Sequence, residues 1–269
     1  MRIFNAAVLG SPISHSLSPL IHQVAYEALE ISAKYTAVEV RGGGLAEYLN
    51  STPPELNSFS LTMPLKEELI ELGFPGSEMA KRIRSANTLI KVADSWKVES
   101  TDVIGFQQSV ASKTNATFQN ILILGAGATA RAAIAAFDSV GVCIDVASRS
   151  EHRTASLKAS ALFAEVSVIA FGEGILWGKY DLVINTSPAG AADFLLDNIA
   201  GASALLFESL YHPWPTALLG FWRSVGLESI DGLDLLVHQA ISQIAIFADI
   251  SVKRSQLAPL MRAAALKRL

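Results

Sequence analysis

The feature that most constrains the fold is a strand, a glycine pair and a helix in immediate succession, at residues 120–137 (NILILGAGATARAAIAAF). The apolar run 121–124 is typical of a strand buried on both faces of a parallel sheet. Gly125 can make the tight turn, and Gly127 has no Cβ to block a pyrophosphate. The helix N-terminus offers free N–H groups and a positive dipole end to that anion. The stretch therefore predicts a dinucleotide-binding unit, in preference to a turn that binds nothing.

The next strand, expected at residues 142–147, indicates which dinucleotide would bind. An NAD site usually has Asp or Glu at this strand end. Here the position is Ser148, followed by Arg149, with Arg153 four residues further on. A carboxylate would repel a 2′-phosphate, whereas two guanidinium groups can bind it through bidentate hydrogen bonds. The pattern favours NADP; the alternative is that both arginines are surface residues, one of them paired with Glu151.

Charge and cysteine usage exclude several classes of partner. The net charge is −4 and Lys and Arg form no cluster, which argues against nucleic acid or an acidic membrane surface. Cys143 is the only cysteine and is expected in the middle of a strand, so we expect neither an intramolecular disulfide nor a cysteine-based zinc site, and no metal-binding residues are predicted. This usage fits a reducing, cytoplasmic compartment. No apolar run reaches the roughly 18 residues that suggest a membrane span.

Strands and helices alternate along the chain, which predicts an α/β fold. A chain of 269 residues can hold two domains of ordinary size, and the alternation restarts near residue 101. Ser18 and Pro19 predict a helix start with Ser18 as the N-cap. A further helix is expected at residues 214–225, and residues 189–202 show no clear periodicity.

Short polar motifs, in order and spacing, give the chain a resemblance to the shikimate dehydrogenase family over almost its full length. Any one motif is weak evidence for the resemblance, but their shared order and spacing are strong evidence. The family has Asn where this chain has Ser60, Ser100 and Ser148, Gly in place of Ala128, and often Gly in place of Asp234. The matching segments are H-S-x-S-P-x-x-H at 15–22, N-V-T-x-P-x-K at 60–66, A-x-N-T-L at 85–89, N-T-D-x-x-G at 100–105, G-A-G-G-x-x-R at 125–131, N-R-T-x-x-R at 148–153 and Y-x-P-x-x-T at 211–216, followed by a helix with Gly232 and Gln239.

The resemblance implies NADPH-dependent reduction of 3-dehydroshikimate to shikimate, a step of aromatic amino-acid (chorismate) biosynthesis. It also implies an N-terminal α/β substrate domain completed by C-terminal helices (residues 1–101 and 235–269), a Rossmann-like NADP-binding domain (residues 102–234), and a monomer or homodimer. Lys66 would be the proton donor, and Asp102 would orient it and bind a substrate hydroxyl. Expected substrate-binding residues are Ser16, Ser18, Thr62, Asn87, Tyr211 and Gln239. Expected cofactor-binding residues are Gly125, Gly127, Ala128, Thr129, Ala130, Ser148, Arg149, Arg153 and Gly232.

Three alternatives remain open at this stage. Lys66 and Asp102 could form a purely structural salt bridge, and Ser16 and Ser18 could serve only to cap a helix. A related enzyme could act on quinate or another ring hydroxy acid with the same Lys/Asp chemistry. The chain could also be a non-catalytic NADP-binding regulator, although the presence of both Lys66 and Asp102 argues against this.

Overall fold

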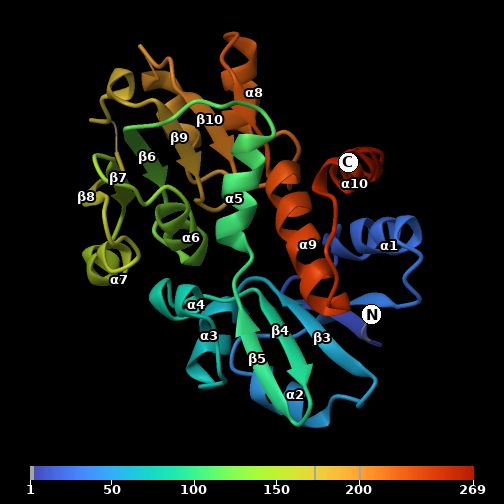
Figure 1. Ribbon diagram of the computed structural model, residues 1–269. Helices are drawn as coiled ribbons and strands as arrows, with labels where there is room; N and C mark the ends of the chain where they lie inside the picture. Colours follow the sequence, from blue (N-terminus) through green and yellow to red (C-terminus); the bar gives the residue numbers. More distant parts are fainter. Residues whose placement is uncertain (1–2, 173, 200) are drawn as a thin grey trace. The chain divides into compact units, whose positions relative to one another are not determined.

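The computed structural model describes residues 3–172, 174–199 and 201–269, which form two compact units (Figure 1). Unit 1 comprises Met1–Gly105 and Leu236–Leu269, and unit 2 comprises Phe106–Leu235. The boundaries fall inside two helices, α5 (Asp102–Ala111) and α9 (Gly232–Ala248). The predicted α/β class is confirmed, whereas the assignment of substrate and cofactor to separate units stays a prediction.

Unit 1 is built on a mixed five-stranded sheet in the order β2-β1-β3-β4-β5. Strand β1 runs parallel to β2 and β3, while β4 runs antiparallel to β3 and β5. The strands are β1 (Asn5–Gly10), β2 (Tyr35–Glu39), β3 (Leu56–Leu61), β4 (Thr88–Val92) and β5 (Ser95–Glu99). The helices, besides parts of α5 and α9, are α1 (Ser18–Ala28), α2 (Leu45–Ser51), α3 (Leu65–Glu71), α4 (Glu78–Arg82) and α10 (Arg254–Leu266).

The alternation of side chains along β3 gives the unit 1 sheet an apolar face and a partly polar one. Phe59 and Leu61 belong to a buried cluster that also contains Leu45 of α2 and Leu65 of α3. Because successive strand residues point to opposite faces, Ser60 points the other way, and it bonds to α9 there. The same unit holds α10 against α1 (Figure 1). The polar face of β3 and β4 is therefore the one that can carry a site.

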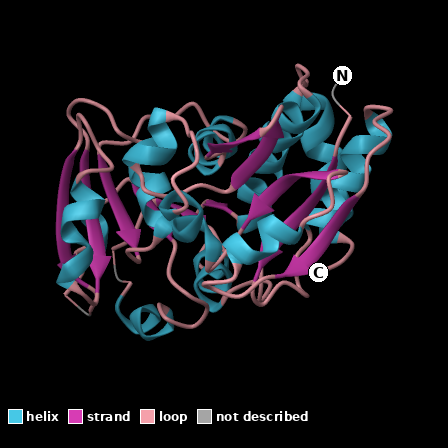
Figure 2. Cartoon of the chain, turned by 90° about the horizontal axis from the view of Figure 1, so that it is seen from below, coloured by secondary structure: helices cyan, strands magenta, loops and turns pink. Residues whose placement is uncertain are grey.

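Unit 2 is a six-stranded, fully parallel sheet in the order β11-β10-β9-β6-β7-β8. This is the doubly wound order 3-2-1-4-5-6 read from the other edge, with the reversal between β6 and β9. Figure 2 shows strands and helices in both units. The elements are β6 (Asn120–Leu124), α6 (Ala128–Ala136), β7 (Cys143–Ser148), η1 (Glu151–Arg153), α7 (Thr154–Lys158), β8 (Glu165–Ala170), η2 (Trp177–Lys179), β9 (Leu182–Asn185), η3 (Asp193–Asn198), β10 (Leu205–Glu208), α8 (Ala217–Ser224) and β11 (Ser229–Ile230).

Both faces of the unit 2 sheet are covered, as the continuous apolar strand 121–124 predicts. Leu122 and Leu124 belong to one buried cluster with Trp222 of α8. On β10, Phe207 packs its ring against Phe106 of α5, with centroids 4.8 Å apart. The Rossmann-like architecture expected of the second half of the chain is confirmed.

The start of α1 differs from the prediction. The helix begins at Ser18, with Leu17 in the N-cap position and no side-chain cap bond. Ser16 takes over part of that role, since its Oγ accepts from the Ser18 N–H at 3.3 Å. The prediction that Ser18 is the N-cap was therefore wrong by one residue.

Two further local predictions need correction, and one segment that carried no prediction contains a helix. The helix expected from residue 214 begins only at Ala217, because the Thr216 hydroxyl caps it by accepting from the Leu219 N–H at 3.2 Å. The segment without periodicity contains the short helix η3. Cys143 is the first residue of β7 and not an inner one.

Candidate active site

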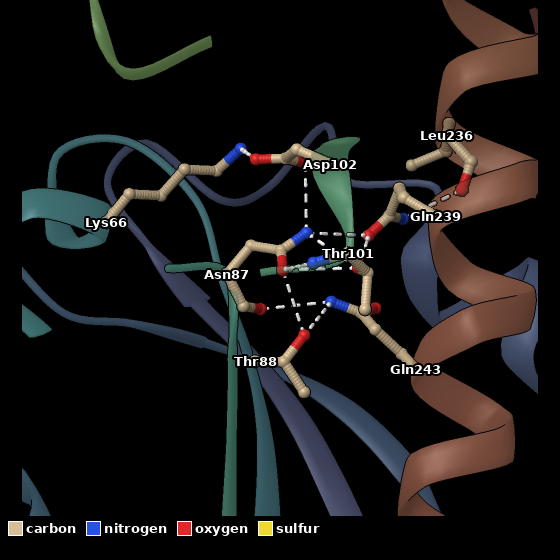
Figure 3. Close-up of polar contacts among 8 residues, drawn as sticks. All are labelled: Lys66, Asn87, Thr88, Thr101, Asp102, Leu236, Gln239 and Gln243. Carbon is tan, nitrogen blue, oxygen red and sulfur yellow. Dashed lines mark hydrogen bonds and ion pairs between the residues drawn. The ribbon is translucent and has the colours of Figure 1, made fainter. Parts of the chain in front are cut away.

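A lysine and an aspartate form the centre of the candidate site in unit 1. Lys66 lies in the first turn of α3, directly after the turn that ends β3, and Asp102 is the first residue of α5. Lys66 Nζ lies 2.6 Å from Asp102 Oδ2, and the two side chains are only 16% and 5% exposed (Figure 3). A carboxylate at a helix N-terminus is favoured by the helix dipole. The structure thus brings the predicted pair into contact; its catalytic role remains a prediction.

Asn87 holds the second oxygen of Asp102. Its Nδ2 donates to Asp102 Oδ1 at 2.9 Å and to Gln239 Oε1 at 3.1 Å. Its Oδ1 accepts from the backbone N–H of Thr101 at 2.8 Å. The two oxygens of Asp102 therefore have different partners, so the carboxylate is fixed in rotation as well as in position. Lys66, Asn87, Asp102 and Gln239 form one continuous polar cluster (Figure 3).

Gln243 is a member of this cluster that the sequence prediction omits. It lies one helical turn after Gln239 on α9, and its Nε2 donates to the Asn87 carbonyl oxygen at 3.0 Å and to Thr88 Oγ1 at 3.2 Å. Residues four apart share a helix face, so the spacing from Gln239 was the available signal. The sequence alone gave no partner for its amide.

The other predicted substrate residues of unit 1 lie in the segments that follow β1 and β3, up to the first residue of α1. Ser16 is half-buried and Ser18 is buried at the start of α1. Thr62 follows β3, and its Cγ2 lies 2.4 Å from the point where a Cβ on Gly10 would stand, so only glycine fits there. Tyr211 lies in unit 2, on the half-buried loop after β10.

The glycine loop of unit 2 has the shape that an anion site requires. Gly125 has φ of +102°, and a Cβ there would lie 2.9 Å from the Ser187 backbone nitrogen. Gly127 is the N-cap of α6 and supplies no side-chain cap bond, which leaves the first N–H groups of that helix for an anion. Ala130 is fully buried, which permits close packing of helix and strand. The remaining residues predicted here, Ala128 and Thr129, are half-buried.

Two arginines follow β7, in different settings. Arg153 lies against the glycine loop, with its Nη1 donating to the Ala126 carbonyl oxygen at 3.2 Å. Arg149 is exposed. The Ser148 hydroxyl bonds within its own turn, donating to the Ser150 oxygen at 2.8 Å. A guanidinium beside the loop and an exposed one after the strand fit a dinucleotide with a further phosphate.

Packing alone already accounts for the glycine at position 232. A Cβ on Gly232 would lie 2.4 Å from both the carbonyl carbon and the oxygen of Leu210. The start of α9 can therefore approach this backbone only at a glycine. Its predicted role in cofactor binding remains a prediction.

A buried carboxylate anchors the loop that carries Tyr211. Glu208 accepts from Asn185 Nδ2, from the Leu210 N–H at 3.0 Å and from Thr216 Oγ1 at 2.7 Å. Burial raises the pKa of Glu208, and these hydrogen bonds act in the opposite direction. Sequence reasoning did not find this anchor, because its partner Asn185 lies 23 positions away, on the neighbouring strand β9.

Among the described residues, no helix is long and apolar enough to span a bilayer, and no group of three or more His, Cys, Asp or Glu side chains is placed to bind a metal ion. A doubly wound sheet with a glycine loop at its switch point, in a chain that also has a partly buried Lys–Asp pair, defines a nicotinamide-dinucleotide dehydrogenase as the class of protein.

Comparisons with known proteins name the family. Residues 8–89 match the family described as the shikimate dehydrogenase substrate binding domain. Shikimate dehydrogenase (NADP(+)) of Caldicellulosiruptor saccharolyticus is 31% identical over 90% of this chain and 91% of that protein. The counterpart from Hyphomonas neptunium is 31% identical over 87% of both chains. The chain belongs to the shikimate dehydrogenase family.

Solved structures agree with this assignment. The shikimate dehydrogenase of Mycobacterium tuberculosis matches with a TM-score of 0.84 and 29% identity, over 97% of this chain and 99% of that one. The enzyme of Thermus thermophilus in complex with NADP(H) and shikimate matches with a TM-score of 0.80 and 25% identity, over 97% and 99%.

Proposed function

We propose that this protein is an NADP-dependent shikimate dehydrogenase, which reduces the ketone of 3-dehydroshikimate to the hydroxyl of shikimate. The observation that carries the proposal is the partly buried contact between Lys66 and Asp102, at 2.6 Å, in a chain with a glycine loop fit for a dinucleotide. Membership of the family adds the substrate and the cofactor. NADPH supplies the hydride when bound.

The protein's own contribution to the reaction is a proton and a fixed geometry. As a hydride adds to the ketone carbon, negative charge develops on the oxygen, and the Lys66 ammonium donates the proton that completes the alcohol. Asp102 Oδ2 keeps that ammonium in place, and its Oδ1 is fixed by Asn87. Lys66 then takes up a proton from solvent for the next turnover. A hydroxyl of the substrate can also bond to Asp102 because carboxylate oxygens accept more than one hydrogen bond.

Substrate recognition is assigned to the remaining polar residues. Asn87 and Gln239 are buried amides that bond to each other, and each can exchange a partner for a substrate hydroxyl. The predicted carboxylate-binding residues are Ser16, Ser18 and Tyr211, and Thr62 is assigned to a substrate hydroxyl. In unit 2, Arg149 and Arg153 are assigned to the 2′-phosphate, which supports NADP over NAD.

The deciding experiment follows NADP reduction at 340 nm with shikimate and with quinate, each tested also with NAD. We expect turnover with shikimate and NADP and much lower rates in the other three combinations. A higher kcat/KM with quinate would replace the proposed substrate, and NADP binding without turnover of either acid would indicate a regulator. We further propose a cytoplasmic monomer or homodimer; light scattering of the purified chain tests its oligomeric state.

A further inference from the structure

Gln243 is buried at the polar face of the unit 1 sheet, and both ends of its carboxamide are engaged. Its Oε1 accepts from Ser60 Oγ at 2.8 Å, while its Nε2 donates to the Asn87 carbonyl oxygen and to Thr88 Oγ1. Ser60 and Thr88 are direct neighbours across β3 and β4. One side chain of α9 therefore joins two adjacent strands beside Asn87, which bonds to Asp102. Figure 3 shows the bonds of Gln243 to Asn87 and Thr88.

Backbone groups fix which way the amides at this site point. The Asn87 carbonyl can only accept, so the Gln243 end that faces it must be Nε2. Its Oε1 then faces Ser60, which must donate its single proton to Gln243 and can only accept from its other neighbour. That neighbour is Tyr35, whose hydroxyl lies 2.7 Å from Ser60 Oγ.

The same reasoning fixes the end nearer to Asp102. The backbone N–H of Thr101 can only donate, so it faces Asn87 Oδ1 and leaves Nδ2 for Asp102. Thr88 accepts from Gln243 and gives its proton to Asn87 Oδ1 at 2.9 Å. The result is a one-directional hydrogen-bond chain, Tyr35 to Ser60 to Gln243 to Thr88 to Asn87 to Asp102, that ends on the carboxylate.

We infer that Gln243 is a positioning residue for the proposed reaction: through Thr88 and Asn87 it sets the rotation of the Asp102 carboxylate, and so the position of the Lys66 ammonium. Among the residues drawn in Figure 3, Gln243 has no hydrogen bond to Asp102 or Lys66, so its proposed effect passes along the chain of hydrogen bonds. Buried hydrogen bonds aligned in one direction polarise one another, so the loss of an inner member weakens the rest. The inference rests on the proposed function.

The primary test compares Gln243→Met, Thr88→Val and the double variant in the full-length protein. Methionine fills the space of glutamine without its amide, and valine matches threonine without its hydroxyl. Each single variant should lower kcat for shikimate by about 10- to 100-fold, the range for small misplacements of reacting groups. Because both residues act on Asn87, the kcat of the double variant should lie within about twofold of the kcat of the less active single variant. NADP binding, measured by fluorescence titration, should stay unchanged.

The controls separate positioning from general damage to the core. Tyr35→Phe removes the first donor of the chain, and Tyr26→Phe makes the same change in a buried ring whose centroid lies 6.5 Å away and whose hydroxyl is outside the chain. Tyr35→Phe should lower kcat by roughly two- to fivefold, as expected for an outer member of a coupled network. Tyr26→Phe should leave it unchanged.

Several outcomes would overturn the inference. They are a kcat near that of the wild type in folded Gln243→Met, losses that multiply in the double variant, or equal effects of Tyr35→Phe and Tyr26→Phe. If Gln243→Met fails to fold, the kcat of Thr88→Val and the comparison of Tyr35→Phe with Tyr26→Phe test the inference in its place. A wild-type protein inactive with shikimate would refute the proposed function, whereas an active wild type with insensitive variants would refute only the role of Gln243.

Discussion

Replacing Lys66 tests both the mechanism and its structural alternative, a simple salt bridge. Lys66→Arg retains a positive partner for Asp102, because guanidinium groups pair well with carboxylates. It removes the proton donor, since the guanidinium does not deprotonate in proteins. Lys66→Ala removes both the donor and the partner. The two variants therefore separate proton donation from charge pairing.

The expected magnitudes follow from the burial of the pair. General acid catalysis contributes about 10²–10⁴ in rate, so kcat should fall by that factor in both variants. With exposures of 16% and 5%, the pair lies between a surface pair and a fully buried one. Lys66→Ala should therefore destabilise the protein by about 1–3 kcal/mol, more than an exposed pair is worth and less than a fully buried one. Lys66→Arg should lower the free energy of unfolding by less than Lys66→Ala does, because it keeps a positive partner for Asp102.

The assays are steady-state oxidation of shikimate and urea unfolding at pH 7. The KM for shikimate should change less than kcat, because the contact of Asn87 with Asp102 survives in both variants. Folded Lys66→Arg that binds NADP and turns over at nearly the wild-type rate would identify the pair as a structural salt bridge. Loss of activity only in Lys66→Ala would lead to the same conclusion.

Three further predictions concern the aspartate, the cofactor and acid stability. Asp102→Ala should lower kcat and raise KM, and with Lys66→Ala the losses should not multiply because the two act as one unit; multiplied losses would show independent roles. Arg149→Asp should weaken NADP binding far more than NAD binding, and equal weakening by titration would exclude contact with the 2′-phosphate. Burial lowers the pKa of His22 from 6.5 to about 3, so between these pH values the unfolded chain binds a proton that the native chain does not. The free energy of unfolding that neutral His22 contributes is thus complete above about pH 6.5 and about 2 kcal/mol smaller at pH 5, which is 1.5 pH units lower. Urea unfolding of His22→Phe should lack this loss. If the variant loses as much stability between pH 7 and pH 5 as the wild type does, the prediction is contradicted.

The sequence predicted those parts of the fold and site that depend on local patterns. The glycine loop could be placed because an apolar run, two glycines and an alanine-rich helix are contiguous at residues 120–137. Lys66 and Asp102 could be named because each stands in a short motif that resembles one of the shikimate dehydrogenase family, at residues 60–66 and 100–105. The one-residue error at Ser18 is of the size expected for helix ends, where capping and dihedral criteria differ.

Contacts between distant segments could not be predicted in the same way. Gln243 bonds to Ser60 across 183 positions and to Asn87 across 156. Periodicity identifies the buried face of a helix, but it does not name the strand that faces it. Tyr35 belongs to none of the polar motifs, and its hydroxyl gains a proposed function only because Ser60 lies beside it in the folded chain.

The close approach of Leu210 to Gly232 affects how relatives of this protein can be recognised. Any side chain at position 232 would displace the Leu210 backbone, so a descendant that had lost dinucleotide binding would still keep the glycine to fold. Its presence in a newly sequenced gene is thus poor evidence for activity. Lys66 is better evidence, because an arginine would serve equally well as a structural partner of Asp102, whereas only a lysine fits the proposed proton donation.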